Sequence, residues 1–396
     1  MKTILFSCCL FLVIAMYSAC REQQGNLCSF TKAVSVPSEQ IILQDMACPV
    51  YIGGYGSSMA YNDKDSTFWL LTDRGPNVDG PTPESKIFPL PDYTPHIGIF
   101  KPEGDSLKLF RKIFLKDSTG LEFSGLPNTQ GDGKTGETAY NLNGQVIRND
   151  KRRGIDPEGL ALAPDGTFWV SDEYGPYLMH FDHKGELIEE LSPFNGKLPS
   201  HYKFRRPNRG MEGLTISTDG QTLYGIMQSP LNEPDGQKTP FSEFIPVLVV
   251  NPVTLAYKEY SYALENPENG VSEITYVNDT TFLVLERDSK FPDNGKTFKR
   301  IYRIILTPQA DITNPVRKEL ACDLLQAIPG YAHDKPEGMA LISNSILSII
   351  NDDDFGITAS KNSSATVIPK RQKNHLLDKN KLYFIPLQSL YKTPTK

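Results

Sequence analysis

The sequence has few cysteines, and their spacing fits no metal-binding motif. Six cysteines occur in 396 residues, and three of these lie within the first 20 residues. The remaining three match no zinc-binding spacing, which argues against a metal held through sulfur. An exported chain can form one disulfide among them, and the pairing stays open: Cys28, Cys48 and Cys322.

An excess of positive charge is also lacking. The formal net charge is −6, which argues against general nucleic-acid binding, because nucleic acids favour a basic surface. Three catalytic signatures are missing as well: the Gly-x-Ser-x-Gly elbow of α/β hydrolases, the Walker phosphate loop and the dinucleotide fingerprint. The sequence therefore favours none of these enzyme classes, and we expect no nucleic-acid partner.

Long hydrophobic runs are absent beyond the N-terminus. Lys2 is followed by an apolar run at Ile4–Met16, whose 13 residues are too few for a membrane span but typical of a signal peptide. Ser18-Ala19-Cys20 then resembles the lipobox of bacterial lipoproteins, although Tyr17 stands where leucine is usual. The pattern predicts export, with a lipid on Cys20.

The predicted organisation follows from this processing. Residues 1–19 form a signal peptide, residues 20–29 a lipoprotein tether, and residues 30–396 a single domain. The lipid on Cys20 would hold the chain at a membrane of the bacterial cell envelope. If cleavage follows the ordinary signal-peptide route, the chain would be secreted instead.

What the sequence does contain is a repeat. One sequence motif, called the phrase from here on, occurs five times. It consists of a small or acidic opening residue, a short alternating strand, a turn, a second apolar strand and a polar cluster. Two looser strand patterns follow each copy. The openings Glu158, Glu212, Glu273 and Glu337 lie 54, 61 and 64 residues apart. The five copies occupy residues 56–76, 157–176, 211–230, 271–289 and 336–356.

Four antiparallel strands recurring at this spacing indicate an all-β fold, a β-propeller. We predict five four-stranded blades, with six left open by the gap of about 100 residues between the first two copies. The last unit ends in one clear strand, Lys381–Leu387. An N-terminal segment, either Phe30–Val36 or Gln40–Leu43, is expected to pair with it and close the ring.

The repeat also predicts where chemistry occurs. The innermost strands of a propeller converge on one axis, so the phrase openings and the polar ends of the second strands should meet at one mouth. Carboxylates gathered there need a cation or basic side chains nearby. Oxygen ligands suit Ca²⁺, with Mg²⁺ or another divalent ion as alternatives. The candidate ligands are Glu158, Asp172, Glu173, Glu212, Glu273, Glu337 and Asp352.

Among these acids we predict catalytic roles for Glu158, Asp172 and Glu212. Arginines stand beside the same loops and suit bidentate contacts with phosphate or carboxylate, which makes them candidate substrate-binding residues: Arg74, Arg153, Arg209 and Arg287. The alternative interpretation is structural, because propeller blades also use such polar repeats for salt bridges and turn capping.

Several motifs together resemble a known family. These are DPEGLALAPDGTFWVSDEYGPYL, LTDRGPN, RGMEGLTISTDGQTLYGIMQSPL and KPEGMAL. In order and spacing they resemble the phytase-like proteins described as having esterase-like activity of phytase, over about residues 50–356. The resemblance implies a secreted or lipid-anchored propeller with phosphoester or ester hydrolase activity. More distantly, the chain is similar to propeller lactonases and calcium-dependent propeller phytases.

Three functions follow as hypotheses. The first is a monomeric, metal-dependent hydrolase of small phosphoesters or other anionic esters, with the metal and arginines offsetting substrate charge. The second is a non-catalytic cell-surface propeller that binds a glycan or polyanion through the same mouth. The third is a lactonase-like sugar-ester hydrolase, which would leave the arginines without a role.

Overall fold

The computed structural model describes residues 33–44, 46, 48–149, 151–293, 295–343, 346–360 and 366–386. The predicted signal peptide and tether, with Cys20 and Cys28, lie outside these residues. Cys48 and Cys322 are free thiols. In the part of the chain that is described, no helix has the length and apolar character needed to cross a membrane.

Three separate four-stranded antiparallel sheets make up the middle of the chain. Each sheet follows chain order, so consecutive strands are neighbours. The first contains β11 (Pro157–Leu162), β12 (Phe168–Asp172), β13 (Tyr177–Phe181) and β14 (Leu187–Leu191). The second contains β15 (Met211–Ile216), β16 (Leu223–Met227), β17 (Ile245–Val250) and β18 (Tyr257–Tyr262). The third contains β19 (Gly270–Asn278), β20 (Thr281–Arg287), β21 (Lys299–Ile305) and β22 (Arg317–Asp323).

An eight-stranded sheet joins the two ends of the chain, in the order β23-β24-β27-β1-β9-β8-β5-β4. One half contains β4 (Ser58–Asn62), β5 (Thr67–Leu71), β8 (His96–Glu103) and β9 (Ser106–Phe114). The other contains β23 (Pro336–Ile342), β24 (Ile346–Asn351), β27 (Lys381–Pro386) and β1 (Val34–Ser35). A single parallel pair between Ser35 and Ser106 connects the halves.

An N-terminal strand does complete the last unit. Val34 of β1 pairs antiparallel with Leu382 of β27, which agrees with the first of the two predicted segments, Phe30–Val36. The other segment contributes instead to β2 (Glu39–Ile41), which pairs with β3 (Val50–Ile52).

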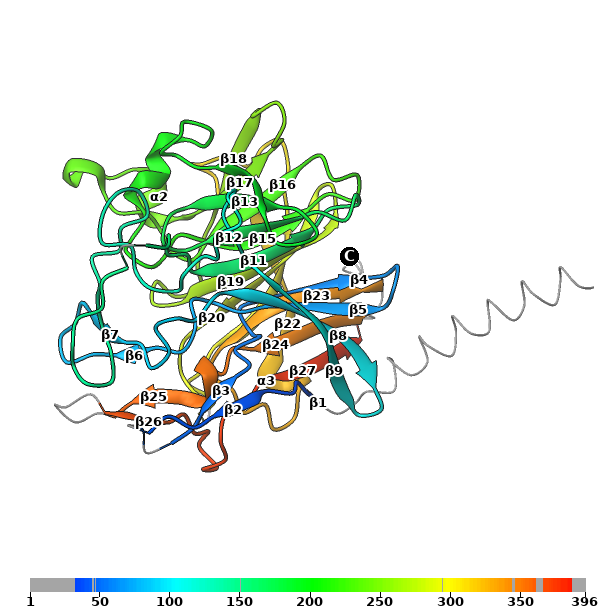
Figure 1. Ribbon diagram of the computed structural model, residues 1–396. Coiled ribbons are helices and arrows are strands. Elements are labelled where there is room, and N and C mark those ends of the chain that lie inside the picture. Colours follow the sequence, from blue (N-terminus) through cyan, green and yellow to red (C-terminus); the bar gives the residue numbers. More distant parts are fainter. Residues whose placement is uncertain are drawn as a thin grey trace, which may run out of the picture.

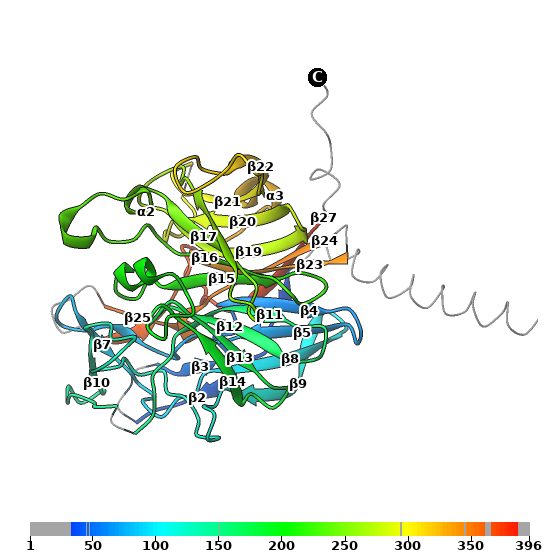
Figure 2. The same ribbon diagram turned by 90° about the horizontal axis from the view of Figure 1, so that it is seen from above.

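The innermost strands form a closed ring. β4 contacts β11, and contacts then run through β15, β19 and β23 back to β4 (Figures 1 and 2). Glycine permits this close approach: a Cβ on Gly159 would lie 2.6 Å from the carbonyl oxygen of Glu212, and one on Gly213 would lie 2.6 Å from the amide nitrogen of Ile274. The fold is thus all-β and propeller-like.

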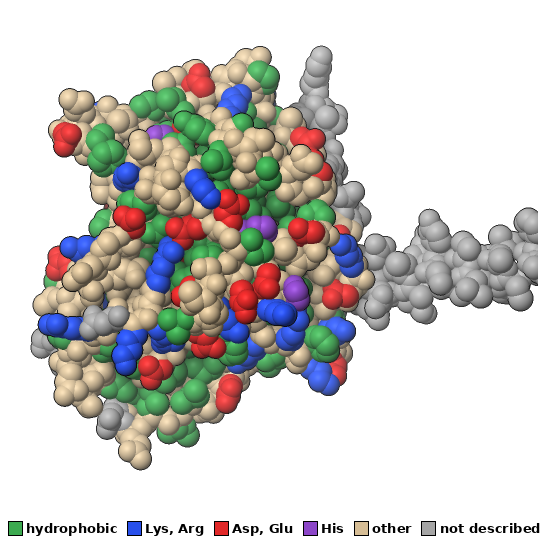
Figure 3. All heavy atoms as spheres, turned by 45° about the horizontal axis from the view of Figure 1, so that its top comes forward, with side chains coloured by type: hydrophobic (Ala, Val, Ile, Leu, Met, Phe, Trp, Pro, Cys, Tyr) green, Lys and Arg blue, Asp and Glu red, His purple; other side chains and the backbone are tan. Residues whose placement is uncertain are grey.

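The hydrophobic core lies between neighbouring sheets. Leu71 and Ile97 of one sheet pack in the same buried cluster as Phe168 and Val170 of the next. Second strands such as β5 and β24 are buried along their whole length, as expected for strands covered on both faces. At the surface, acidic and basic side chains are interspersed on the face shown in Figure 3.

Smaller elements gather beside one end of the ring (Figure 1). They include the sheet of β6 (Val78–Asp79), β7 (Ser85–Ile87) and β10 (Thr138–Tyr140), and the hairpin of β25 (Ile357–Ala359) and β26 (Val367–Pro369). In the described ranges the short helices are η1 (Ser200–Phe204), η2 (Pro234–Gly236), α2 (Pro240–Glu243), α3 (Leu324–Ala327) and η4 (Asp354–Gly356).

Candidate metal centre in the central cavity

A β-bulge near the start of four inner strands sets the direction of the key side chains. The pairing register shifts between Pro157 and Gly159, and at the corresponding points of β15, β19 and β23. A bulge leaves one residue unpaired and redirects its side chain. The residues at these bulges line one central cavity: Glu158, Glu212, Ser272 and Glu337.

A second set of cavity residues comes from the ends of the second strands: Asp73, Glu173, Gln228, Arg287 and Asp352. The cavity has a volume of about 860 Å³. Parts of β6, β7 and β25 form its outer wall, so the small sheets at the end of the ring deepen the mouth. Openings and strand ends from different repeat units therefore converge on this cavity.

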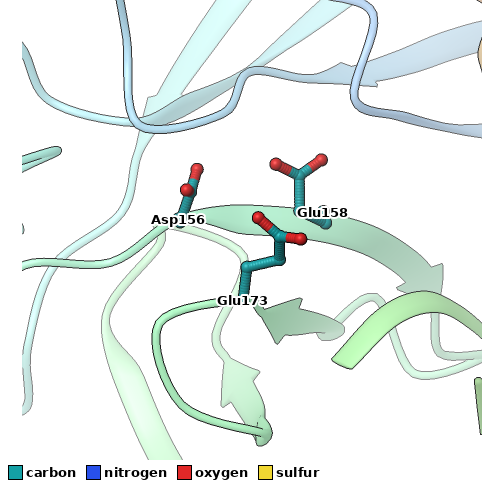
Figure 4. A group of neighbouring side chains, drawn as sticks. All are labelled: Asp156, Glu158 and Glu173. Atoms are coloured by element: carbon teal, nitrogen blue, oxygen red, sulfur yellow. The ribbon is translucent and has the colours of Figure 1, made fainter. Parts of the chain in front are cut away.

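Three carboxylates lie close together in the described part of the chain. One oxygen from each of Asp156, Glu158 and Glu173 lies within 4.8 Å of the others, and the side chains of Glu158 and Glu173 point into the same space (Figure 4). Burial, reinforced by the neighbouring acid Glu212, holds the pKa of Glu158 and of Glu173 well above the usual range. A divalent cation is the kind of ligand that relieves such repulsion.

Gln228 connects this group to Glu212. Its Nε2 atom donates to Glu173 Oε1 at 2.7 Å and to Glu212 Oε2 at 3.0 Å. Burial, and then the charge of Glu337, raises the pKa of Glu212 to about 8. Glu212 therefore lies in the cavity beside the three carboxylates, within a shared hydrogen-bond network.

The predicted arginines occupy different positions. Arg74 lines the cavity but is engaged: its Nη1 atom lies 2.8 Å from Glu137 Oε2, and its Nε atom lies 3.4 Å from Asp156 Oδ2. Arg287 also lines the cavity, where its Nε atom donates to Ser272 Oγ at 2.7 Å and its Nη2 atom pairs with Glu337. Arg209 is exposed at the rim.

Three predicted site residues do not line the cavity. Asp172 accepts backbone hydrogen bonds from Asp156 at 2.8 Å and Gly175 at 2.9 Å, so it shapes the loop that carries the acidic group. Arg153 pairs with Glu190 at 2.6 Å and stacks over the ring of Tyr177. In both cases the side chain turns from the mouth toward partners within its own sheet and loops.

Glu273 departs from the prediction for a different reason. In the phrase VSEITY it stands one residue later than Glu158 does in PEGLAL, and thus at the position of Gly159. Its carboxylate accepts from Ser58 Oγ at 2.5 Å and from the backbone amides of Leu214 and Ile274. Glu273 therefore links inner strands inside the ring, and Ser272 takes the place in the cavity.

Several residues that line the cavity were not among the predicted site residues, and three of them lie just before or just after the inner hairpins: Asp73, Asp156 and Lys335. A signal for Asp156 and Lys335 existed, since each directly precedes a Pro-Glu-Gly phrase. Asp73 follows a strand in the first repeat copy, and its Oδ1 atom accepts a hydrogen bond from the backbone amide of Gly75. An aspartate after a strand can cap a turn in this way or line a cavity, and the sequence pattern is the same in both cases.

The raised pKa values predict how metal-free stability depends on pH. Folding raises the pKa of Glu212 to about 8 and that of Asp172 to about 7, from 4.5 and 3.8. A carboxyl group with a raised folded-state pKa stabilises the fold when protonated, and this contribution is lost as pH rises through that pKa. In chelator, the melting temperature should therefore fall between about pH 5 and pH 8.

Excess Ca²⁺ should reduce that fall, because a cation offsets the charge of the ionised acids. Thermal scans at matched ionic strength, with calcium or with chelator, measure both effects. A chelator-treated protein whose melting temperature rises over this pH range would contradict the burial of ionisable carboxyl groups described above.

Comparison with known proteins adds a family. A fungal protein of Arthroderma benhamiae, named "Uncharacterized secreted protein", is 29% identical over 362 residues, which cover 75% of this chain and 69% of that protein. Among solved structures, a Lactobacillus plantarum protein is 12% identical with a TM-score of 0.38, covering 86% of this chain and 89% of its own. Virginiamycin B lyase from Staphylococcus aureus is 12% identical with a TM-score of 0.31, covering 88% and 99%.

At such TM-scores we draw nothing about function from the two structures. A family model also matches the sequence. The model of the phytase-like family, described as "Esterase-like activity of phytase", matches residues 50–355, which is most of the chain. The same residues contain the inner strands, the bulges and the three clustered carboxylates. This chain therefore belongs to the phytase-like family.

Proposed function

We propose that this protein is an exported hydrolase that cleaves phosphoesters or other anionic esters with the help of a divalent cation, Ca²⁺ in the first instance. The observation that carries the proposal is the group of Asp156, Glu158 and Glu173 at the cavity. Glu158 and Glu173 form no ion pair among the described residues, so the charge of the group is offset only in part.

The residues present fit such a cation. All three donors are carboxylate oxygens, which suit Ca²⁺ or Mg²⁺ better than softer transition metals. A bound divalent cation would polarise the ester and help to generate the nucleophile. Arg74 contacts Asp156 with its backbone amide at 3.0 Å and its side chain at 3.4 Å, and so holds that ligand in place.

The remaining cavity residues suit substrate binding and proton transfer. Arg287 and the rim residue Arg209 offer guanidinium groups to an anionic part of the substrate. Glu212 lies beside the carboxylate group and is oriented by Gln228, so it is the residue placed to move a proton during cleavage.

We also infer the architecture and location of the working protein. Five four-stranded units, three separate and two within the eight-stranded sheet, are consistent with a five-bladed propeller that works as a monomer. Export is supported by the N-terminal apolar run and by a relative named as a secreted protein. A lipid on Cys20 would then anchor the protein at the cell envelope.

A substrate panel tests the proposal. Phosphomonoesters, phytate, carboxyl esters and lactones are offered to the purified exported chain with Ca²⁺ or with chelator, and phosphate or acid release is measured. We expect turnover of an anionic ester that requires calcium. No turnover of any substrate, together with a chelator-sensitive melting temperature, would contradict the proposed hydrolase activity. It would favour a propeller that binds a glycan or polyanion.

A further inference from the structure

A charged residue followed by Pro-Glu-Gly opens two of the inner strands, and in the second copy of this motif the charged residue is a lysine. Asp156-Pro157-Glu158-Gly159 opens β11, and Lys335-Pro336-Glu337-Gly338 opens β23. Both strands bulge directly after their proline. In each copy the residue before the proline accepts a 2.9 Å backbone hydrogen bond from the next cavity acid, Glu173 or Asp352.

These matched contacts assign equivalent positions. Lys335 stands where Asp156 stands, Glu337 where Glu158 stands, and Asp352 where Glu173 stands. The inner strands β15 and β19 have Gly210 and Gly270 at the lysine position. Of these four strands, two therefore combine a charged opening residue, a bulged glutamate and a second acid.

The two copies differ in how their charge is offset. Lys335 Nζ lies 3.2 Å from Asp352 Oδ2 and 2.5 Å from Asp354 Oδ1. Glu337 is paired with Arg287. Every one of these acids in the second copy thus has an ion pair within the chain itself, whereas Glu158 and Glu173 have none within the described residues.

We propose that Lys335 is a resident cation that takes the place of a divalent metal in the second copy of the motif, so that the cavity holds one divalent ion and not two. This inference rests on the proposed function, because it presumes a cation at the first copy. An ammonium group offsets charge and donates hydrogen bonds but offers no open coordination position. The half of the cavity with Lys335 therefore holds no metal, and the half with Asp156 receives it.

Calcium stoichiometry, measured by titration calorimetry on the purified exported chain, tests the assignment. Wild type should bind one equivalent of Ca²⁺, and Lys335→Asp should bind two. The matched control is Lys86→Asp, which changes charge equally at another cavity-lining lysine paired with an aspartate, Asp79 at 2.5 Å. It should still bind one equivalent.

The outcomes separate this inference from the proposed function. One equivalent in both wild type and Lys335→Asp would overturn the role of Lys335 while leaving the metal centre standing. Two equivalents in Lys86→Asp would overturn it as well, because any loss of positive charge would then suffice. Zero equivalents in wild type would contradict the proposed metal centre itself.

A reciprocal variant covers the case in which Lys335→Asp does not fold. Asp156→Lys places the ammonium group in the first copy, so the chain should bind no Ca²⁺ and its melting temperature should not respond to chelator. Retention of one equivalent by a folded Asp156→Lys protein would overturn the equivalence of the two copies.

Discussion

Replacing Glu158 with glutamine should weaken calcium binding by at least about 100-fold, since even groups that only support a metal ligand cost 10–100-fold when lost. The change keeps the shape of the side chain but replaces one of the three carboxylate donors at the cavity with a neutral amide. Calorimetry on the exported chain measures the dissociation constant, and thermal scans show whether the calcium-dependent rise in melting temperature disappears with it.

Without metal, the Glu158→Gln variant should be more stable than the wild-type protein. Glu158 is buried among other acids, so a neutral amide at this position removes repulsion at neutral pH. Glu84→Gln provides the matched control, because Glu84 lies on the cavity wall but is exposed and outside the carboxylate group. If Glu158→Gln and Glu84→Gln bound calcium equally well, the three carboxylates would not be the metal centre.

Replacing Glu212 with glutamine should lower kcat by about 10²–10⁴, the usual contribution of a positioned acid or base. Calcium affinity should change far less, because Glu212 stands outside the group of Asp156, Glu158 and Glu173. Steady-state kinetics on the best substrate from the panel, run beside calcium titrations of the same variant, measure the two quantities separately.

Glu268→Gln serves as the control here, since Glu268 lines the same cavity from an exposed position. If the Glu212→Gln enzyme kept the wild-type kcat, Glu212 would not be the residue that transfers the proton. A variant that loses activity and calcium affinity in proportion would instead make Glu212 a ligand, as the sequence alone suggested among its metal candidates.

The fold class and the convergence of the polar strand ends were predictable from the repeat alone. Short apolar strands such as TFWLL and ILSIIN recur with polar ends at the spacing of propeller blades, and this predicts sheets packed around an axis. Once the strands converge, Glu158, Glu173, Glu212, Glu337 and Asp352 must meet at one mouth, and in the structure they do.

The set of acids that face the cavity depends on the folded arrangement of the strands. Side chains alternate along a strand, so a shift of one residue exchanges its two faces. The bulges therefore send Glu158 and Ser272 into the cavity while Glu273 links neighbouring inner strands through Ser58 and Leu214.

The repeat likewise does not predict the ion-pair and hydrogen-bond partners of the charged groups. Arg153 and Asp172 lie close in sequence to the cavity acids, yet Glu190 and the amide of Asp156 engage them elsewhere. Asp156 and Lys335 precede the same Pro-Glu-Gly phrase and have opposite charges. The ring places both residues at one cavity, and only this placement makes them equivalent positions of a single site. A repeat specifies strands and their ends, whereas contacts between residues far apart in the chain determine the charge that each position must offset.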